Sequence, residues 1–170
     1  MDEVTLNPHE MKIAQLVGER YYQPDREDRS FTGDVYDEDY AKKINLDGFL
    51  AELAVAKWLG SYPTGFMCDP DGGKATPFDG TVPRIGATYD VKTTRHKNGH
   101  LVLPLSFAHT NESDIFIFTT VDPPVLTVAG WIEADKFLTD QYVDYFKSFG
   151  LRYVASQEDL QPTHKLISYA

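Results

Sequence analysis

The segment 89–94 carries the residues of this sequence that are best suited to chemistry. It holds an acid and a lysine, Asp90 and Lys92, two positions apart in a run that is typical of a β-strand. Residues two apart in a strand point to the same face, so these two side chains lie together. The opposite face carries the neutral and apolar side chains Tyr89, Val91 and Thr93. The strand therefore has a polar face that packing alone does not explain.

Two further acids are expected to converge on this face. Asp79 stands in the tetrapeptide Pro-Phe-Asp-Gly, and Glu52 interrupts a helix that is otherwise nearly all apolar. Neighbouring carboxylates repel each other unless a proton or a hard cation lies between them. An all-oxygen ligand set favours Mg²⁺ or Mn²⁺ over Zn²⁺, which prefers histidine and cysteine. Lys92 adds a cation that can hold an attacking water or offset charge on phosphorus. These parts suit phosphodiester hydrolysis.

Each of these residues also has a purely structural explanation. Glu52 can lie at the helix edge with its carboxylate in solvent, and Asp79 can be a turn acid before Gly80. Lys92 can be a surface lysine that pairs with Asp90. The chemical interpretation fails only if all of these structural explanations are true at once. We therefore prefer the chemical interpretation.

A local cluster of basic residues surrounds this segment, although the formal net charge is −10. An acidic chain is unfavourable for a nucleic-acid-binding protein, because phosphates are usually met by a basic surface. A bound divalent cation would offset part of the acidity. The cluster is either a solvated turn or a phosphate-binding surface, and the two histidines in it either contact phosphate or have no role. The candidate nucleic-acid-binding residues are Arg84, Thr94, Arg95, His96, Lys97 and His100.

Helices are predicted from capping residues and apolar periodicity. Asn7 and Pro8 begin a helix that runs to about Tyr22. An acidic loop over 25–39 follows, either a lid over the site or a solvated connection. Asp47 is expected to cap a helix over 48–59 that Gly60 ends. Later elements are short helices over 134–137 and 140–149 and a helix start at Ser156.

Strands are predicted from β-branched and aromatic runs bounded by turn residues. Segments 78–82 and 87–94 form an antiparallel hairpin, turned by 83–86, that brings Asp79 beside Asp90. A short strand over 62–68 and a turn over 69–73 precede it, and 101–103 resumes extended structure. The apolar run 114–121 predicts a central strand with 126–132 as its partner. Four aromatic side chains are expected in the core: Trp131, Tyr142, Tyr145 and Phe146.

The pattern resembles the PD-(D/E)XK nuclease superfamily, the restriction-endonuclease-like fold that phage exonucleases and junction resolvases also share. The matching residues are Glu52, Asp79 and the D-x-K element Asp90-Val91-Lys92, in the expected order, although Phe78 separates Pro77 from Asp79. The resemblance covers residues 47–132 as catalytic core and implies helix, three antiparallel strands, helix and a further strand. It implies metal ligation by Asp79, Asp90, the Val91 carbonyl and Glu52, and water activation by Lys92.

The chain as a whole is expected to be one nuclease-like domain over 1–170, with an N-terminal helix and acidic loop over 1–40. The expected fold class is α/β (α+β), with a central mixed β-sheet flanked by helices. One cysteine and no apolar run near 20 residues predict a cytoplasmic protein without a membrane partner, in the host cytoplasm if phage-encoded. The leading function is a Mg²⁺- or Mn²⁺-dependent DNA endonuclease. The alternatives are a non-catalytic nucleic-acid- or protein-binding module and, more weakly, an acidic DNA-mimicking or regulatory protein. The resemblance also makes a homodimer plausible, because many members of that superfamily need two sites to cut two strands.

Overall fold

The structure is a computed structural model that describes residues 1–21, 38–61, 63 and 77–168. Its helices are α1 (Pro8–Tyr21), α2 (Glu38–Leu59), α3 (Phe107–Thr110), α4 (Ala134–Phe137) and α5 (Thr163–Ile167). Its strands are β1 (Asp2–Thr5), β2 (Gly80–Thr81), β3 (Thr88–Thr94), β4 (Leu101–Pro104), β5 (Ile115–Asp122), β6 (Val125–Glu133), β7 (Val143–Tyr145) and β8 (Leu151–Ala155). Short 3₁₀ turns lie at Asp140–Tyr142, Lys147–Phe149 and Gln157–Asp159.

The strands form two sheets. The larger is mixed, with the order β1-β6-β5-β3-β2, and the smaller is antiparallel, with the order β4-β8-β7. Only the β3–β5 pair of the larger sheet is parallel. A parallel pair needs a crossover connection, and the chain that makes it carries β4 and α3. The expected class, a mixed β-sheet flanked by helices, is confirmed.

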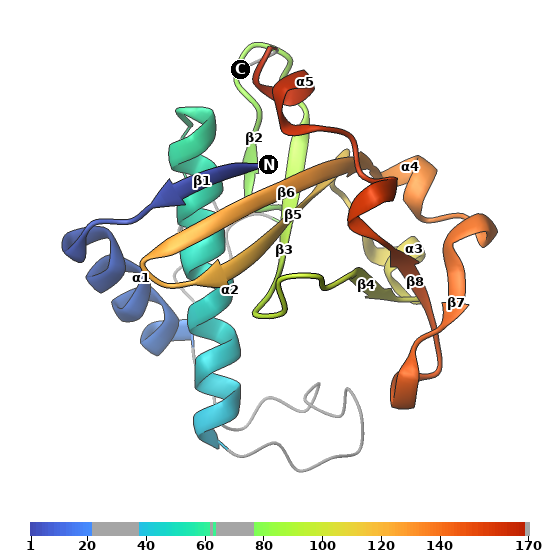
Figure 1. Cartoon of the computed structure of the whole chain (residues 1–170), viewed down its shortest axis with the longest axis horizontal. Helices are drawn as coiled ribbons and strands as arrows, with labels where there is room; N and C mark the ends of the chain where they lie inside the picture. The colour runs from blue at the N-terminus through green and yellow to red at the C-terminus, as the bar shows by residue number, and fades with distance from the viewer. Residues whose placement is uncertain (22–37, 62, 64–76, 169–170) are drawn as a thin grey trace.

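The larger sheet lies between helix α2 and the smaller sheet (Figure 1). Tyr89 of β3 and Ile117 of β5 belong to the core cluster that contains the apolar side chains of α2. Phe116 and Phe118 of β5 point to the other face and pack with residues of β4 and β8. Successive strand residues alternate between the faces, so Asp90 and Lys92 lie on the face away from Tyr89, as predicted.

The start of α1 confirms the predicted cap. The Asn7 side-chain oxygen accepts hydrogen bonds from the backbone N–H groups of His9 and Glu10 at 2.9 and 3.0 Å. The Glu10 carboxylate returns the contact by accepting from the Asn7 N–H at 2.7 Å. This reciprocal arrangement satisfies three backbone donors that a helix N-terminus leaves exposed.

Helix α2 begins ten residues earlier than predicted, at Glu38 instead of Gly48. Asp47 is therefore inside the helix and does not cap it, because its carboxylate is bound by Arg95 instead. Leu46 of the added turns lies against Gly18 of α1. Glu38 and Asp39 belong to this helix, whereas the rest of the predicted acidic loop up to residue 37 lies outside the described residues. Gly60, at φ +64°, follows the end of α2 as expected.

The predicted helix over 140–149 is wrong. The segment forms two 3₁₀ turns with strand β7 between them, because β7 pairs antiparallel with β8. Tyr145 is 70% exposed and not in the core, and Phe146 is half-buried, while Trp131 and Tyr142 are buried as expected. Strands β1, β7 and β8 were not predicted. The short helix over 134–137 is confirmed, and Ser156 caps a 3₁₀ turn through a capping box with Asp159.

The central strands agree with the prediction. β5 and β6 pair antiparallel in the middle of the larger sheet, and the hairpin partner of β3 is the two-residue strand β2. The predicted strand over 62–68 and turn over 69–73 fall outside the described residues, apart from residue 63. Within the described part of the chain, no helix is both long enough and apolar enough to cross a membrane.

Candidate active site

Asp79 and Asp90 meet at the edge of the larger sheet, where β2 pairs with β3. The Asp79 N–H donates to the Tyr89 carbonyl at 2.9 Å, and the Asp79 Oδ2 accepts from the Val91 N–H at 2.7 Å. These two bonds tie Asp79 to Tyr89 and Val91, the two residues of β3 that flank Asp90. Asp79 is 4% exposed and Asp90 is 9% exposed. The predicted hairpin therefore does bring the two acids together.

The two carboxyl groups affect each other's ionisation. The pKa of Asp90 is raised to about 6. Burial is the largest cause, the positive charge of Lys92 opposes the shift, and the neighbouring Asp79 carboxylate adds to it. Desolvation penalises the charged form of a carboxyl group, and a second carboxylate adds repulsion. The pair therefore favours a proton or a cation between its oxygens over two bare negative charges.

Lys92 completes this cluster from the same strand face. Its Nζ lies 2.7 Å from Asp90 Oδ1, and its side chain is 28% exposed. The ammonium also lies 4.9 Å from the centre of the Phe107 ring at the start of α3. An aromatic face attracts a cation, so both contacts hold the ammonium near the carboxylates. The predicted pairing of Asp90 and Lys92 on one face is confirmed.

Glu52 is buried in α2, with 7% of its surface exposed, so a position at the solvent edge of the helix is excluded. It lies on the Tyr89 side of the sheet. The pKa of the Tyr89 hydroxyl is raised to about 12. Burial is the largest cause, a hydrogen bond with Ser61 opposes it, and the negative charges of Asp79 and Glu52 add to the shift. Both acids are thus near the Tyr89 hydroxyl. Asp79 is also near Asp90, so it lies close to the surroundings of both Glu52 and Asp90.

The donor chemistry of the Asp79–Asp90 pair fits a hard divalent cation. Both groups are buried, supply only oxygen, and repel each other when ionised. In residues 1–21, 38–61, 63 and 77–168, however, no three His, Cys, Asp or Glu side chains gather closely enough to hold a metal ion. The ligand roles of Glu52 and of the Val91 carbonyl therefore stay predictions.

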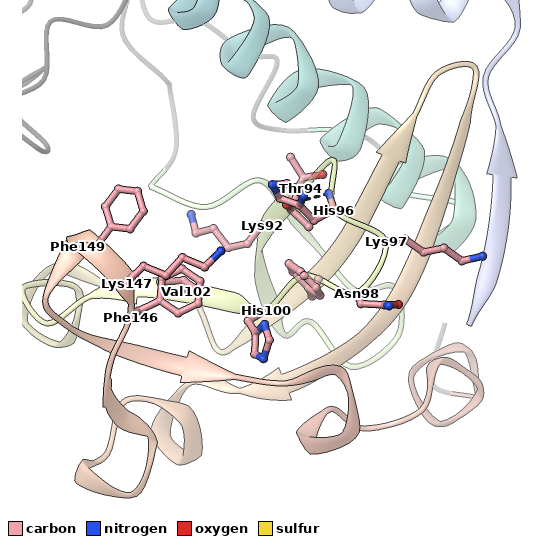
Figure 2. Close-up of a pocket in the computed structure, with 13 residues that line it drawn as sticks. Lys92, Thr94, His96, Lys97, Asn98, His100, Val102, Phe146, Lys147 and Phe149 are labelled. Atoms are coloured by element: carbon pink, nitrogen blue, oxygen red, sulfur yellow. Dashed lines mark hydrogen bonds between the residues drawn. The ribbon is translucent and has the colours of Figure 1, made fainter.

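A groove of about 720 Å³ opens beside Lys92 (Figure 2). Five of the residues singled out from the sequence line it: Lys92, Thr94, His96, Lys97 and His100. The end of β3 and the turn that follows it place these side chains in the groove wall. Sequence reasoning missed three other residues of its wall, namely Phe146, Lys147 and Phe149. Their signal was the alternation of aromatic and basic residues in Phe-Lys-Ser-Phe, which the predicted helix obscured.

The two arginines of the predicted nucleic-acid surface lie elsewhere. Arg95 donates two hydrogen bonds to the Asp47 carboxylate, both at 2.6 Å, and so connects the end of β3 to α2. Arg84 is exposed in the turn between β2 and β3, with a φ of 68°. Neither residue lines the groove beside Lys92. The fold therefore separates them from the cluster that the sequence suggested.

Comparison with known proteins gives no relative. No protein-family model matches the sequence, and neither the curated proteins nor the solved structures compared with it give a significant match.

Proposed function

We propose that this protein is a Mg²⁺- or Mn²⁺-dependent nuclease that hydrolyses phosphodiester bonds in DNA, as an endonuclease. The observation that carries this proposal is the buried Asp79–Asp90 pair with the Lys92 ammonium 2.7 Å from Asp90 Oδ1. Two acids and a lysine, of which the lysine lies in the wall of a basic groove, are the minimum set for metal-assisted attack on a phosphodiester.

The order of the elements supports a restriction-endonuclease-like core. Helix α2, the antiparallel pair β2–β3, strand β4 of the smaller sheet, the short helix α3 and strand β5 follow one another along the chain. Strand β5 lies parallel to β3. This order agrees with the helix, antiparallel strands, helix and further strand that the resemblance implies.

Each residue has a definite task in this proposal. Asp79 and Asp90 would hold the metal, with Glu52 and the Val91 carbonyl as further oxygen donors. The metal would supply Lewis-acid stabilisation of the negative charge on the phosphate. The Lys92 ammonium, held between Asp90 and the Phe107 ring, orients a water molecule or stabilises charge that develops on phosphorus. The burial of both acids keeps bulk water from screening these charges.

The deciding experiment is calorimetric titration of Mn²⁺ into the native protein and the Asp79→Ala/Asp90→Ala double variant, followed by incubation of both with plasmid DNA. Saturable binding and Mg²⁺- or Mn²⁺-dependent nicking, both lost in the folded double variant, are the expected results. A folded native protein that neither binds Mn²⁺ nor cuts DNA would overturn the proposal. Sedimentation of the native protein would test for the homodimer that two-strand cutting favours.

One observation favours a second candidate, a non-catalytic nucleic-acid- or protein-binding module on the same fold. The described residues do not bring a third acid, histidine or cysteine into the Asp79–Asp90 pair, and many metal nucleases use three. On this alternative the Asp90–Lys92 contact is structural and the groove binds without cutting. Metal-dependent cleavage by the native protein, lost in Asp90→Ala, excludes it. Either candidate is compatible with a cytoplasmic protein.

A further inference from the structure

The groove beside Lys92 continues past the candidate active site into a second hollow. The second hollow has a volume of about 350 Å³ and shares four wall residues with the first, Lys92, Val102, Phe146 and Phe149. Figure 2 shows Phe146 and Phe149 on one side of Lys92 and His96 and Asn98 on the other. The two hollows therefore adjoin at Lys92, so a ligand that fills both passes directly over its ammonium.

The walls of this double groove are basic, in contrast to the chain as a whole. Lys92, Lys97, Lys147 and Arg152 supply positive charge, and none of the described residues that line either hollow is Asp or Glu. The complete chain carries a formal net charge of −10. A positively charged groove on an acidic protein selects an anionic ligand and keeps it out of contact with the rest of the surface.

Two phenylalanine rings give the groove a second chemical character. Phe146 precedes the 3₁₀ turn Lys147–Phe149 between β7 and β8, and Phe149 is the last residue of that turn. Both phenylalanines are half-buried. Their ring centres are 6.3 Å apart and their planes differ by only 23°. A flat group that stacks on one ring is thus nearly parallel to the other. Lys147 Nζ lies over the Phe146 ring, 5.2 Å from its centre, so a cation is held at one face of that ring.

This combination of charge and aromatic rings fits nucleotides whose bases are unstacked. In a duplex the base faces are covered by neighbouring base pairs and cannot contact a protein ring. Proteins that hold single strands combine a basic groove along the phosphates with aromatic rings on which bases stack. A groove for duplex backbone alone needs the basic residues but gains nothing from the paired phenylalanines.

We propose that the double groove binds a single-stranded stretch of DNA. Bases stack on Phe146 and Phe149, phosphates lie along Lys147 and His100, and the strand crosses Lys92. This assignment rests on the proposed nuclease function for its choice of DNA and names the substrate as a strand with unpaired bases. The binding step itself does not depend on metal or on cleavage.

Binding is therefore measured in EDTA, which removes divalent metal ions and so prevents cleavage of the probe. The probe is a fluorescein-labelled oligo(dT) of about 12 nucleotides, within the size range of single-strand grooves, and a labelled duplex of equal length is the comparison. The variants are Phe146→Ala, Phe149→Ala and the corresponding tyrosine substitutions, which keep the ring. Tyr145→Ala is the matched control, because Tyr145 is adjacent and exposed but does not line the groove. Circular dichroism and thermal melting confirm that each variant folds.

The native protein is expected to bind oligo(dT) more tightly than the duplex. Each alanine variant should bind oligo(dT) about 5- to 150-fold more weakly. The tyrosine variants should bind close to native, and Tyr145→Ala should be unchanged. Lys147→Met should reduce the slope of log affinity against log salt by about 0.7. Equal affinity for duplex, or unchanged oligo(dT) binding by folded Phe146→Ala and Phe149→Ala, would overturn the assignment.

The two proposals can fail separately. A native protein that binds oligo(dT) through the phenylalanines but never cuts with Mg²⁺ or Mn²⁺ retains the groove assignment and loses the nuclease function. A protein that cuts DNA in an Asp90-dependent way, but binds oligo(dT) equally well without the two rings, retains the nuclease function and loses the groove assignment.

Discussion

The Lys92 ammonium lies 2.7 Å from Asp90 Oδ1, across one repeat of the same strand face. The aspartate is buried beside Asp79, so this contact joins a buried pair of like charges to the groove outside. Lys92 is at once the counter-charge of the site and part of the groove wall. Perturbing either residue should therefore affect both the ionisation of the pair and its chemistry.

The stability of the protein without metal should fall as pH rises through the titration of Asp90. The pKa of Asp90 is raised from 3.8 to about 6, mainly by burial. The unfolded chain loses this proton near pH 4, so the stability from the protonated carboxyl is present below that pH and is lost by about pH 6. With about 1.4 kcal/mol for each unit, the loss is on the order of 3 kcal/mol.

Urea unfolding in EDTA at pH 4 and at pH 7 measures this loss. Asp90→Asn should lose less stability over the interval than the native protein, because it has no carboxyl group to ionise. Asp135→Asn, on the exposed side of α4, is the control and should follow the native curve. Parallel curves for the native protein and Asp90→Asn would show that Asp90 ionises normally.

Lys92→Met should lower the rate of DNA cleavage by about 10²- to 10³-fold, the usual cost of removing one group that stabilises charge in a transition state. Methionine keeps most of the length of the side chain and its packing against Phe107. Single-turnover cleavage with Mg²⁺ measures the effect, and Lys136→Met on α4 is the control with the same charge change. Equal rates for Lys92→Met and Lys136→Met would remove Lys92 from the chemistry.

Gly80→Ala should destabilise the fold by about 2 kcal/mol, in the range for overpacking. A Cβ at Gly80 would overlap the ring carbon Cζ and the hydroxyl of Tyr89, which is fully buried. Gly48→Ala is the matched control with the opposite expectation. Nothing lies within 4 Å of a Cβ added at Gly48, and this residue lies inside α2. Alanine there should stabilise by about 0.5–1 kcal/mol. Urea unfolding compares the two, and a similar effect of both would contradict the close contact between β2 and Tyr89.

Local patterns were enough to predict the centre of the site. The two-residue period of a strand places Asp90 and Lys92 on one face, and the turn residues after Val82 predict the hairpin that brings Asp79 alongside. Both follow from interactions between residues close in sequence. The apolar run of β5 similarly predicted a central strand, because only a strand buried on both faces is apolar throughout.

The elements that were missed depend on partners far away in the sequence. Strand β7 exists because β8 pairs with it, and its own residues are equally compatible with a helix. Aspartate is a preferred residue at helix N-caps. The partner of the Asp47 carboxylate is instead Arg95, 48 residues further along the chain. The groove wall at Phe146 and Phe149 depends on that same β7–β8 hairpin. No local pattern contains this information.

The Asp47–Arg95 contact should stabilise the fold and not the binding of nucleic acid. Arg95 forms two hydrogen bonds of 2.6 Å with Asp47, whose side chain is 10% exposed, while that of Arg95 is 42% exposed. Arg95→Met leaves a largely buried carboxylate without its cation, which costs about 1–3 kcal/mol. The Asp47→Asn/Arg95→Met double variant should recover part of that loss, since no charge then remains buried. A double-mutant cycle by urea unfolding measures the coupling, and oligo(dT) affinity should stay within about twofold throughout. Independent effects of the two substitutions, or a large loss of oligo(dT) affinity in folded Arg95→Met, would return Arg95 to the nucleic-acid surface that the sequence alone suggested.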